Sequence, residues 1–186
     1  LSDFFGMCMR RLAIIDLNTG AQPISYQVRD LHIILNGEIY NFLELKEQLI
    51  SKNYFFKTNS DTEVLLYLYA EYGDNFIEKV NGIFSFAIYD NKEKKLLIYR
   101  DRLGVKPLYY YLDRDKFIFS SNLDSLAEIN VLNEIDKFSV LSYLFNNYVP
   151  GENSIKSKIK KLLPGSLITI KNNKFSVKKY WDVNKI

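Results

Sequence analysis

The hydrophobic pattern at the start of the chain predicts two buried strands. Residues 12–17 (LAIIDL) and 31–35 (LHIIL) form short apolar runs, and a polar turn at 18–20 follows the first of them. The second run leads directly into 36–38 (NGE), which is expected to terminate the strand. The pattern therefore predicts a short polar segment after each of these strands.

Helices are predicted to follow, each with its own start signal. Asn41 with Glu44, and Ser60 with Glu63, have the spacing of a capping box, in which two side chains satisfy backbone N–H groups of the first turn. A third, shorter helix is expected around 76–77.

Antiparallel hairpins dominate the rest of the predicted structure. The run 83–89 (IFSFAIY) carries no charge on either face, so we expect it to be covered on both sides. The hairpins are expected to pair 83–89 with 96–101, 107–113 with 117–121, and 167–171 with 175–181. Helical patterns occupy 123–129 and 136–147. This mixture is typical of an α+β fold with helices layered on sheets, and residues 1–186 are expected to form a single domain.

Composition argues against several classes of function. Of 186 residues, 47% are apolar and 25% charged, as in soluble globular domains, and no apolar run approaches the length of a membrane span. The net charge is only +3, and the densest lysine cluster, within 156–161, lacks the aromatic residues or arginines that nucleic-acid binding requires. We therefore expect neither a membrane nor a nucleic acid as partner. A single cysteine and the lack of a leader pattern favour a reducing compartment, and we expect a cytoplasmic protein.

Metal and thiol chemistry have little support from the residues themselves. The single histidine, His32, and the single cysteine, Cys8, do not have the spacing of a zinc or haem motif, so no metal site is predicted. His32 lies in a strand pattern and is interpreted as structural, since no GxSxG elbow supports a serine triad. Cys8 has apolar neighbours and is interpreted as a buried structural thiol rather than a nucleophile.

Polar residues at the ends of the predicted strands have the chemistry to bind an amino acid. Arg11 precedes the first strand, 36–38 follows the second, and Asp61 opens a helix. Arginine can hold a carboxylate through two hydrogen bonds, acidic side chains can hold an ammonium group, and an Asn amide beside a Gly N–H can stabilise an oxyanion. Taken singly, each residue also has an ordinary explanation: a surface arginine, a turn, and a favourable charge at a helix start.

Five long segments occur in one order along the chain: RRLAIIDLNTGAQPI (10–24), LNGEIYNFLELKEQL (35–49), TNSDTEVLLYLY (58–69), VNGIFSFAIYD (80–90) and RDRLGVKPLYYY (100–111). In this order they resemble the glutaminase domain of glutamine-dependent asparagine synthetases, which are class II glutamine amidotransferases of the N-terminal-nucleophile hydrolase type. The resemblance extends to the closing KKYWDV (178–183) and so covers nearly the whole chain.

The resemblance implies a four-layer αββα sandwich and a defined chemistry. In the family, the thiolate of an N-terminal cysteine attacks the side-chain amide of glutamine, while its own α-amine shuttles the proton. Asn36, through its side chain, and Gly37, through its backbone N–H, are expected to form the oxyanion hole.

The resemblance also assigns the binding of glutamine itself. Arg11 is expected to pair with the α-carboxylate, and Glu38 and Asp61 are expected to lie near the α-ammonium group. Backbone groups around Ile14 and Ile15 are expected to line the pocket.

The chain departs from the family pattern at its start. The family begins Met-Cys-Gly-Ile, with a further segment before the part that matches Arg10 and Arg11, whereas this chain begins at Leu1. Cys8 stands beside the arginine motif, so its nitrogen is an amide and cannot act as a base. We therefore expect an N-terminally incomplete type 2 glutamine amidotransferase domain that lacks its nucleophile and is inactive on its own.

The synthetase domain of the family is also absent from the sequence. ATP and Mg²⁺ are implied only for that domain, so no cofactor is expected within residues 1–186. Glutamine and the synthetase domain of the same protein are the expected partners. Asn122 stands where the family usually has a glutamate, which puts any contact between domains at that position in doubt.

Three functions stay open at this point. The chain is the glutaminase segment of an asparagine synthetase, supplying ammonia for the ATP-dependent amidation of aspartate. Alternatively, it serves an amidotransferase with another carboxylate acceptor, since the glutaminase half does not choose the acceptor. Lastly, it is a catalytically dead glutamine-binding or partner subunit. A chain without its first strands would expose core surface, so a homodimer is one expected state.

Overall fold

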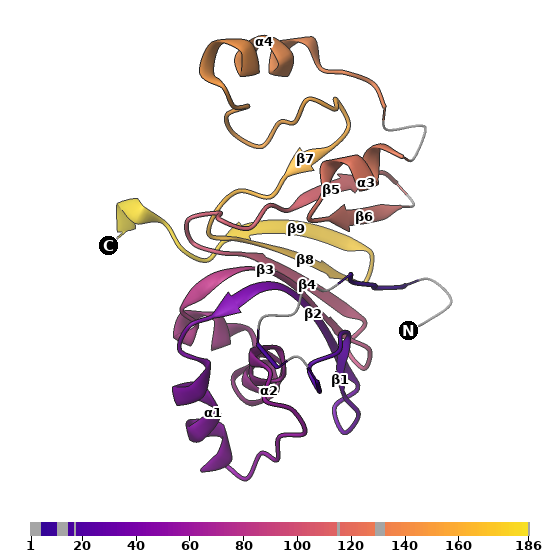
Figure 1. The fold of residues 1–186 in the computed structure, drawn as a ribbon. Helices are drawn as coiled ribbons and strands as arrows, with labels where there is room; N and C mark the ends of the chain where they lie inside the picture. The colour runs from indigo at the N-terminus through magenta and orange to yellow at the C-terminus, as the bar shows by residue number, and fades with distance from the viewer. Residues whose placement is uncertain (1–4, 11–14, 17, 115, 129–132, 186) are drawn as a thin grey trace.

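The computed structural model describes residues 5–10, 15–16, 18–114, 116–128 and 133–185, and most of these residues form four layers (Figure 1). A six-stranded antiparallel sheet lies at the centre, in the order β1-β2-β3-β4-β8-β9. Its strands are β1 (Ile24–Tyr26), β2 (Leu31–Ile39), β3 (Gly82–Asp90), β4 (Lys95–Arg100), β8 (Ser166–Lys171) and β9 (Lys174–Lys179). A three-stranded sheet in the order β6-β5-β7 forms the next layer, from β5 (Tyr109–Leu112), β6 (Phe117–Ser120) and β7 (Lys160–Lys161).

Helices form the two outer layers. The six-stranded sheet is covered by α1 (Phe42–Ile50), α2 (Asp61–Tyr72) and the 3-10 helix Gly73–Lys79, and the three-stranded sheet is covered by α3 (Leu123–Ala127). The helix α4 (Lys137–Asn146) stands apart at one end of the molecule, and a 3-10 turn at Val183–Lys185 lies near the C-terminus. None of the described helices is long and apolar enough to cross a membrane.

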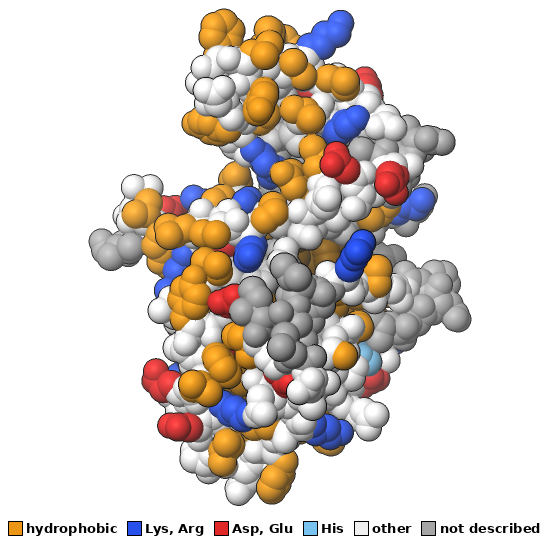
Figure 2. All heavy atoms as spheres, viewed as in Figure 1, with side chains coloured by type: hydrophobic (Ala, Val, Ile, Leu, Met, Phe, Trp, Pro, Cys, Tyr) orange, Lys and Arg blue, Asp and Glu red, His pale blue; other side chains and the backbone are white. Residues whose placement is uncertain are grey.

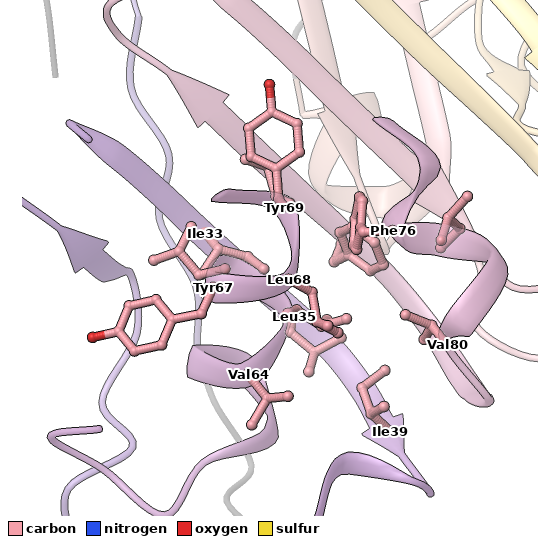
Figure 3. Close-up of a cluster of buried hydrophobic side chains, with 14 of the residues drawn as sticks. Ile33, Leu35, Ile39, Val64, Tyr67, Leu68, Tyr69, Phe76 and Val80 are labelled. Carbon is pink, nitrogen blue, oxygen red and sulfur yellow. The ribbon is translucent and has the colours of Figure 1, made fainter. Parts of the chain in front are cut away.

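Three hydrophobic clusters join the four layers. The largest lies between α2 and the six-stranded sheet, where Ile33, Leu68 and Phe76 are fully buried (Figure 3). A second cluster joins the two sheets, and a third, around Leu126 and Ile159, joins the three-stranded sheet to α3. The αββα architecture follows from these clusters, because each sheet face is apolar and is covered by the next layer.

The prediction that 83–89 is covered on both faces is confirmed. Side chains alternate along a strand, so Phe84, Phe86 and Ile88 of β3 enter the helix-side cluster, whereas Ala87 and Tyr89 enter the cluster between the sheets. The predicted hairpins and the predicted helices after residue 60 are all present, with ends that shift by a few residues.

The prediction that 36–38 terminates the second strand is wrong. β2 continues to Ile39 and pairs with β3 along its whole length, with Gly37 opposite Phe84 and Ile39 opposite Gly82. A Cβ at Gly37 would lie 2.1 Å from the Ile83 carbonyl oxygen, so the missing side chain is what allows the strands to approach there.

Two expectations about local structure are also corrected. In the predicted strand 12–17, Ile15 and Asp16 are not part of a strand, and Asp16 has φ +53°. Residues 12–14 and 17 lie outside the described residues. At α1, Asn41 forms no capping hydrogen bond, because its side chain instead bonds the backbone of Lys79 and Asn81. A tertiary contact thus replaces the predicted capping box with Glu44.

Candidate active site

A cavity of about 880 Å³ lies at the junction of the two sheets and the start of α2. Its volume is in the range of small-molecule sites. The polar side chains on its wall are those of Cys8, Arg10, Gln22, Asn36, Glu38, Asp61, Thr62, Ser85, Lys106, Ser120, Ser121, Asn122 and Ser125. Of the residues predicted for glutamine binding, the cavity gathers Ile15, Asn36, Gly37, Glu38 and Asp61. Arg11 and Ile14 lie outside the described residues.

The backbone of Gly37 is directed away from β3, toward the side of β2 where β1 pairs only with Leu31–Ile33 among the described residues. On the neighbouring strand, Phe84 bonds Asp101 through both its N–H and its C=O, at 3.3 and 2.8 Å. In an antiparallel pair both backbone groups of a residue face the same side, and the facing side alternates along the strand. Phe84 therefore faces away from β2, and its partner Gly37 faces away from β3.

Side chains from elsewhere occupy the positions on either side of Gly37 along this side of β2. The side-chain amide of Gln22 bonds both backbone groups of Leu35, at 2.6 Å to its N–H and 3.2 Å to its C=O. The Asp61 carboxylate accepts the Ile39 N–H at 3.0 Å. Gly37 thus lies between two positions whose backbone groups are bonded, and both Gly37 and Asn36 line the cavity.

Asp61 brings a buried carboxylate to the same wall. It is the first residue of α2 and is only 4% exposed. Burial raises the pKa of its carboxyl group, against the opposing effect of the hydrogen bonds from Ile39 and Thr62. With Glu38, it supplies two carboxylates to the cavity, which suits a cationic ligand group.

The segment that leads into α2 is fixed by two other acidic residues. Glu63 is buried and accepts the backbone N–H groups of Lys57 and Thr58, at 3.0 and 2.7 Å. Asp16 accepts the Asn59 N–H at 2.8 Å, and its hydrogen bonds with Thr19 lower the pKa of its carboxyl to about 2. The predicted Ser60 cap is confirmed, since the Ser60 hydroxyl accepts the Thr62 N–H, but Glu63 binds the preceding loop instead of completing the box.

Asp101, which is 1% exposed, fixes the loop that carries Lys106 to the cavity. Its carboxylate accepts N–H groups from Phe84, Leu103, Val105 and Lys106 at 3.0–3.3 Å. One side chain therefore links β3, behind the cavity, to the loop that carries Lys106 into the cavity wall.

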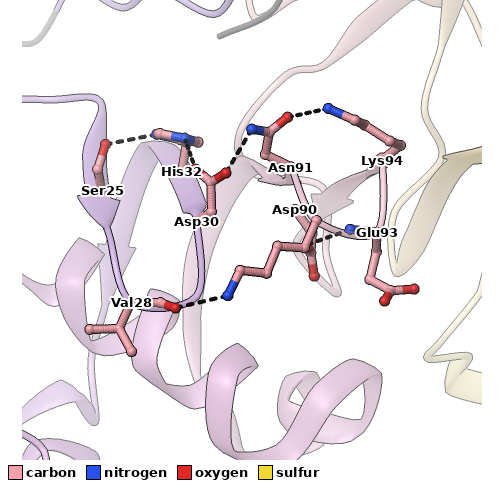
Figure 4. A network of polar contacts seen from close by, with 9 residues as sticks. Ser25, Val28, Asp30, His32, Asp90, Asn91, Glu93 and Lys94 are labelled. Carbon is pink, nitrogen blue, oxygen red and sulfur yellow. Dashed lines mark hydrogen bonds and ion pairs between the residues drawn. The ribbon is translucent and has the colours of Figure 1, made fainter.

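Cys8 lines the cavity, whereas His32 is not among the described residues that line it. Cys8 is exposed and lies in the cavity wall, so its interpretation as a buried structural thiol is wrong. His32 bonds Ser25 at 2.8 Å and Asp30 at 3.3 Å, in a network that joins the β1–β2 and β3–β4 turns at one end of the strands (Figure 4). His32 is not among the described residues that line the cavity, which agrees with a structural role.

Sequence reasoning did not single out several residues of the cavity. Gln22, Ser85 and Lys106 lie within the recognised segments, but nothing in their spacing indicates a role, because each reaches the cavity through strand pairing or a folded loop. Among the described residues, no group of three or more His, Cys, Asp or Glu side chains is arranged to hold a metal ion.

The fold, the cavity and the sequence together define a class of protein. Residues 2–181 match the family described as a glutamine amidotransferase domain, and the chain belongs to this family. Within it, the chain is similar to glutamine-hydrolysing asparagine synthetases. It is 41% identical over 180 residues to asparagine synthetase 1 of Bacillus subtilis (strain 168), and 38% identical over 145 residues to asparagine synthetase B of Escherichia coli (strain K12).

These relatives are much longer than the chain. The matches cover 96% and 78% of the chain, but only 28% and 26% of the two asparagine synthetases. Among solved structures, glutamine phosphoribosylpyrophosphate amidotransferase of B. subtilis, in complex with ADP and GMP, has a TM-score of 0.61 at 22% identity, covering 86% of this chain and 32% of that one. This likeness concerns the fold, and it agrees with the α+β, N-terminal-nucleophile architecture expected from the sequence.

Proposed function

We propose that the cavity binds glutamine and that the domain serves as the glutamine-hydrolysing part of an asparagine synthetase, supplying ammonia for the ATP-dependent amidation of aspartate. The proposal rests on the residues gathered at the end of β2 and the start of α2. There, Asn36, Gly37, Glu38 and Asp61 all line one cavity, and Asp61 accepts the Ile39 N–H. The site thus offers oxyanion donors and an ammonium site within the reach of one amino acid.

The roles proposed for the residues are those that the sequence resemblance implies, and their chemistry suits them. Glu38 and Asp61 hold the α-ammonium group, and the carboxamide extends to Asn36 and Gly37, whose N–H groups stabilise the oxyanion formed when a thiolate attacks the carboxamide carbon. Arg11 binds the α-carboxylate, and backbone groups near Ile14 and Ile15 complete the pocket; the sequence resemblance supports these assignments.

Calorimetric titration with glutamine tests the binding site. We expect Glu38→Gln to weaken glutamine binding about tenfold or more, because the substitution removes a negative charge opposite the ammonium group. Glu47→Gln, on the outer side of α1, is the matched control and should leave the affinity unchanged. Equal affinities for the three proteins would refute the assignment of Glu38.

We further propose that residues 1–186 alone do not hydrolyse glutamine. Cys8 places a thiol in the cavity wall, but its nitrogen is part of a peptide bond and cannot accept a proton as an α-amine does. Glutamate release should therefore stay at the level of the blank. Release above it that Asn36→Ala abolishes would show that the chain has a nucleophile of its own.

A further inference from the structure

The helix α4 turns its hydrophobic side outward. Four large apolar side chains, Phe138, Leu141, Leu144 and Phe145, are 81%, 51%, 70% and 84% exposed. With 3.6 residues per turn they form one stripe about 120° wide. The buried residue of this helix is Ser139, whose hydroxyl bonds Asp136 at 2.6 Å. The apolar side of α4 therefore faces away from the rest of the domain, and a polar residue faces toward it.

The stripe is part of a larger apolar surface. Ile135, before the helix, and Tyr148, after it, are 58% and 61% exposed. Figure 2 shows hydrophobic side chains gathered at this end of the molecule. Single exposed hydrophobic residues are common, but a group of this kind marks an interaction surface, of which a surface that another protein region covers is one kind.

The segment that presents α4 is also basic. Residues 133–161 contain five lysines and three acidic residues, so they contribute +2 to the net charge of +3. In a two-fold pair of identical chains the same surface meets itself, so these like charges would face each other. Charge complementarity favours instead a different surface with an apolar centre and an acidic rim.

We propose that α4 is the docking element for the synthetase region of the same polypeptide. The inference rests on the proposed function, because an asparagine synthetase contains a synthetase region. It also rests on the length of the relatives: the match covers only 28% of asparagine synthetase 1 of B. subtilis. A region joined covalently to this domain has a high effective concentration at the stripe. The apolar stripe then lies in the interface between the two regions.

Hydrogen exchange tests this inference on the native full-length polypeptide and on residues 1–186 alone. In residues 1–186 we expect the amides of α4 to exchange rapidly, because the helix packs on so little. In the full-length polypeptide they should exchange at least about tenfold more slowly. Equal exchange in the two forms would overturn the proposal, as would a reading frame that encodes no synthetase region after this domain.

A pair of variants separates docking from folding. Phe138→Ser combined with Phe145→Ser should abolish the slow exchange of α4 in the full-length polypeptide and leave glutamine affinity unchanged. Phe55→Ser removes a side chain that is also 84% exposed, on a loop beyond α1, and should leave the exchange of α4 slow. Protection of α4 in residues 1–186 that rises with concentration would show that a second copy covers the stripe, contrary to the proposal. Slow exchange of α4 without glutamine binding would instead refute only the proposed function.

Discussion

Asp61 combines a structural role with an unfavourable environment. Its carboxylate accepts the Ile39 N–H at the end of β2, yet burial raises the pKa of the carboxyl group. The folded protein therefore binds this proton more tightly than the unfolded chain does. The resulting contribution to stability is complete below the pKa of the unfolded chain and is lost as the pH rises through the pKa of the folded protein. Because burial disfavours the charged form, a cationic ligand group beside Asp61 would favour its carboxylate.

The substitution Asp61→Asn should separate stability from binding. Asparagine keeps an oxygen that accepts the Ile39 N–H and removes the buried charge. We expect the melting temperature to rise by about 2 °C or more near neutral pH and to change little at about pH 3.5, where the carboxyl is largely protonated. Glutamine affinity should fall at the same time. A lower melting temperature near neutral pH would contradict this account of the charge.

Gly37 should tolerate no side chain. Its φ is +145°, and a Cβ would lie 2.1 Å from the Ile83 oxygen and 2.7 Å from the Phe84 Cα. Gly37→Ala should therefore reduce the free energy of unfolding by about 3 kcal/mol or more in a urea titration. Gly6→Ala, where nothing lies within 4 Å of the added carbon, is the control. Similar losses in the two variants would show that β2 and β3 are not as close as described.

At the scale of single residues, the sequence supported the candidate site only through local motifs. Asn36, Glu38 and Asp61 stand in recognisable segments, and the structure places them in one cavity. Gln22 could not be found in this way, because its role is to bond a strand thirteen residues further along the chain. The exposure of Cys8 was missed because apolar neighbours in sequence do not determine what covers a side chain.

The loop after β4 depends on one acidic side chain. Asp101 binds four backbone N–H groups, including three from the loop residues Leu103, Val105 and Lys106. Asp101→Ala would leave these donors without their charged acceptor in a buried setting. We expect a loss of about 3 kcal/mol or more in the free energy of unfolding, with faster hydrogen exchange across 103–106.

The control for this prediction is Asp113→Ala. Asp113 also accepts hydrogen bonds, from Tyr111 and Arg114, but at an exposed turn. Its loss should cost less than about 1 kcal/mol, because water replaces the missing acceptor. If the two variants were equally destabilised, the Asp101 network would not be the element that fixes the cavity wall.

Among the helices and strands, the sequence predicted the type of each element better than the residues at which it ends. Periodicity identified the helices and hairpins, whereas the length of β2 depends on two glycines that let it stay close to β3. The Asn41 capping box failed because the side chain found partners around residue 80, far along the chain. Local signals compete with tertiary contacts, and at these positions the tertiary contacts are stronger.

In the whole molecule, the two larger cores lie on the two faces of the six-stranded sheet, and β4, like β3, contributes to both. Leu97 belongs to the cluster on the helix side and Ile98 to the cluster between the sheets, and both are fully buried. Leu97→Ala and Ile98→Ala should each lower the free energy of unfolding by about 3 kcal/mol. Because one strand carries both side chains, each variant should unfold in a single transition. Two separate transitions in Ile98→Ala would show that the three-stranded sheet and the six-stranded sheet unfold independently.

A titration of ¹⁵N-labelled protein with L-glutamine, followed by NMR, tests whether residues 36–39 of β2 and the start of α2 form a glutamine site. We predict saturable shifts of the backbone N–H signals of 36–39 and 61–62, with much smaller shifts for D-glutamine at the same concentration. Saturable shifts confined to other parts of the chain, or none at all, would contradict the account.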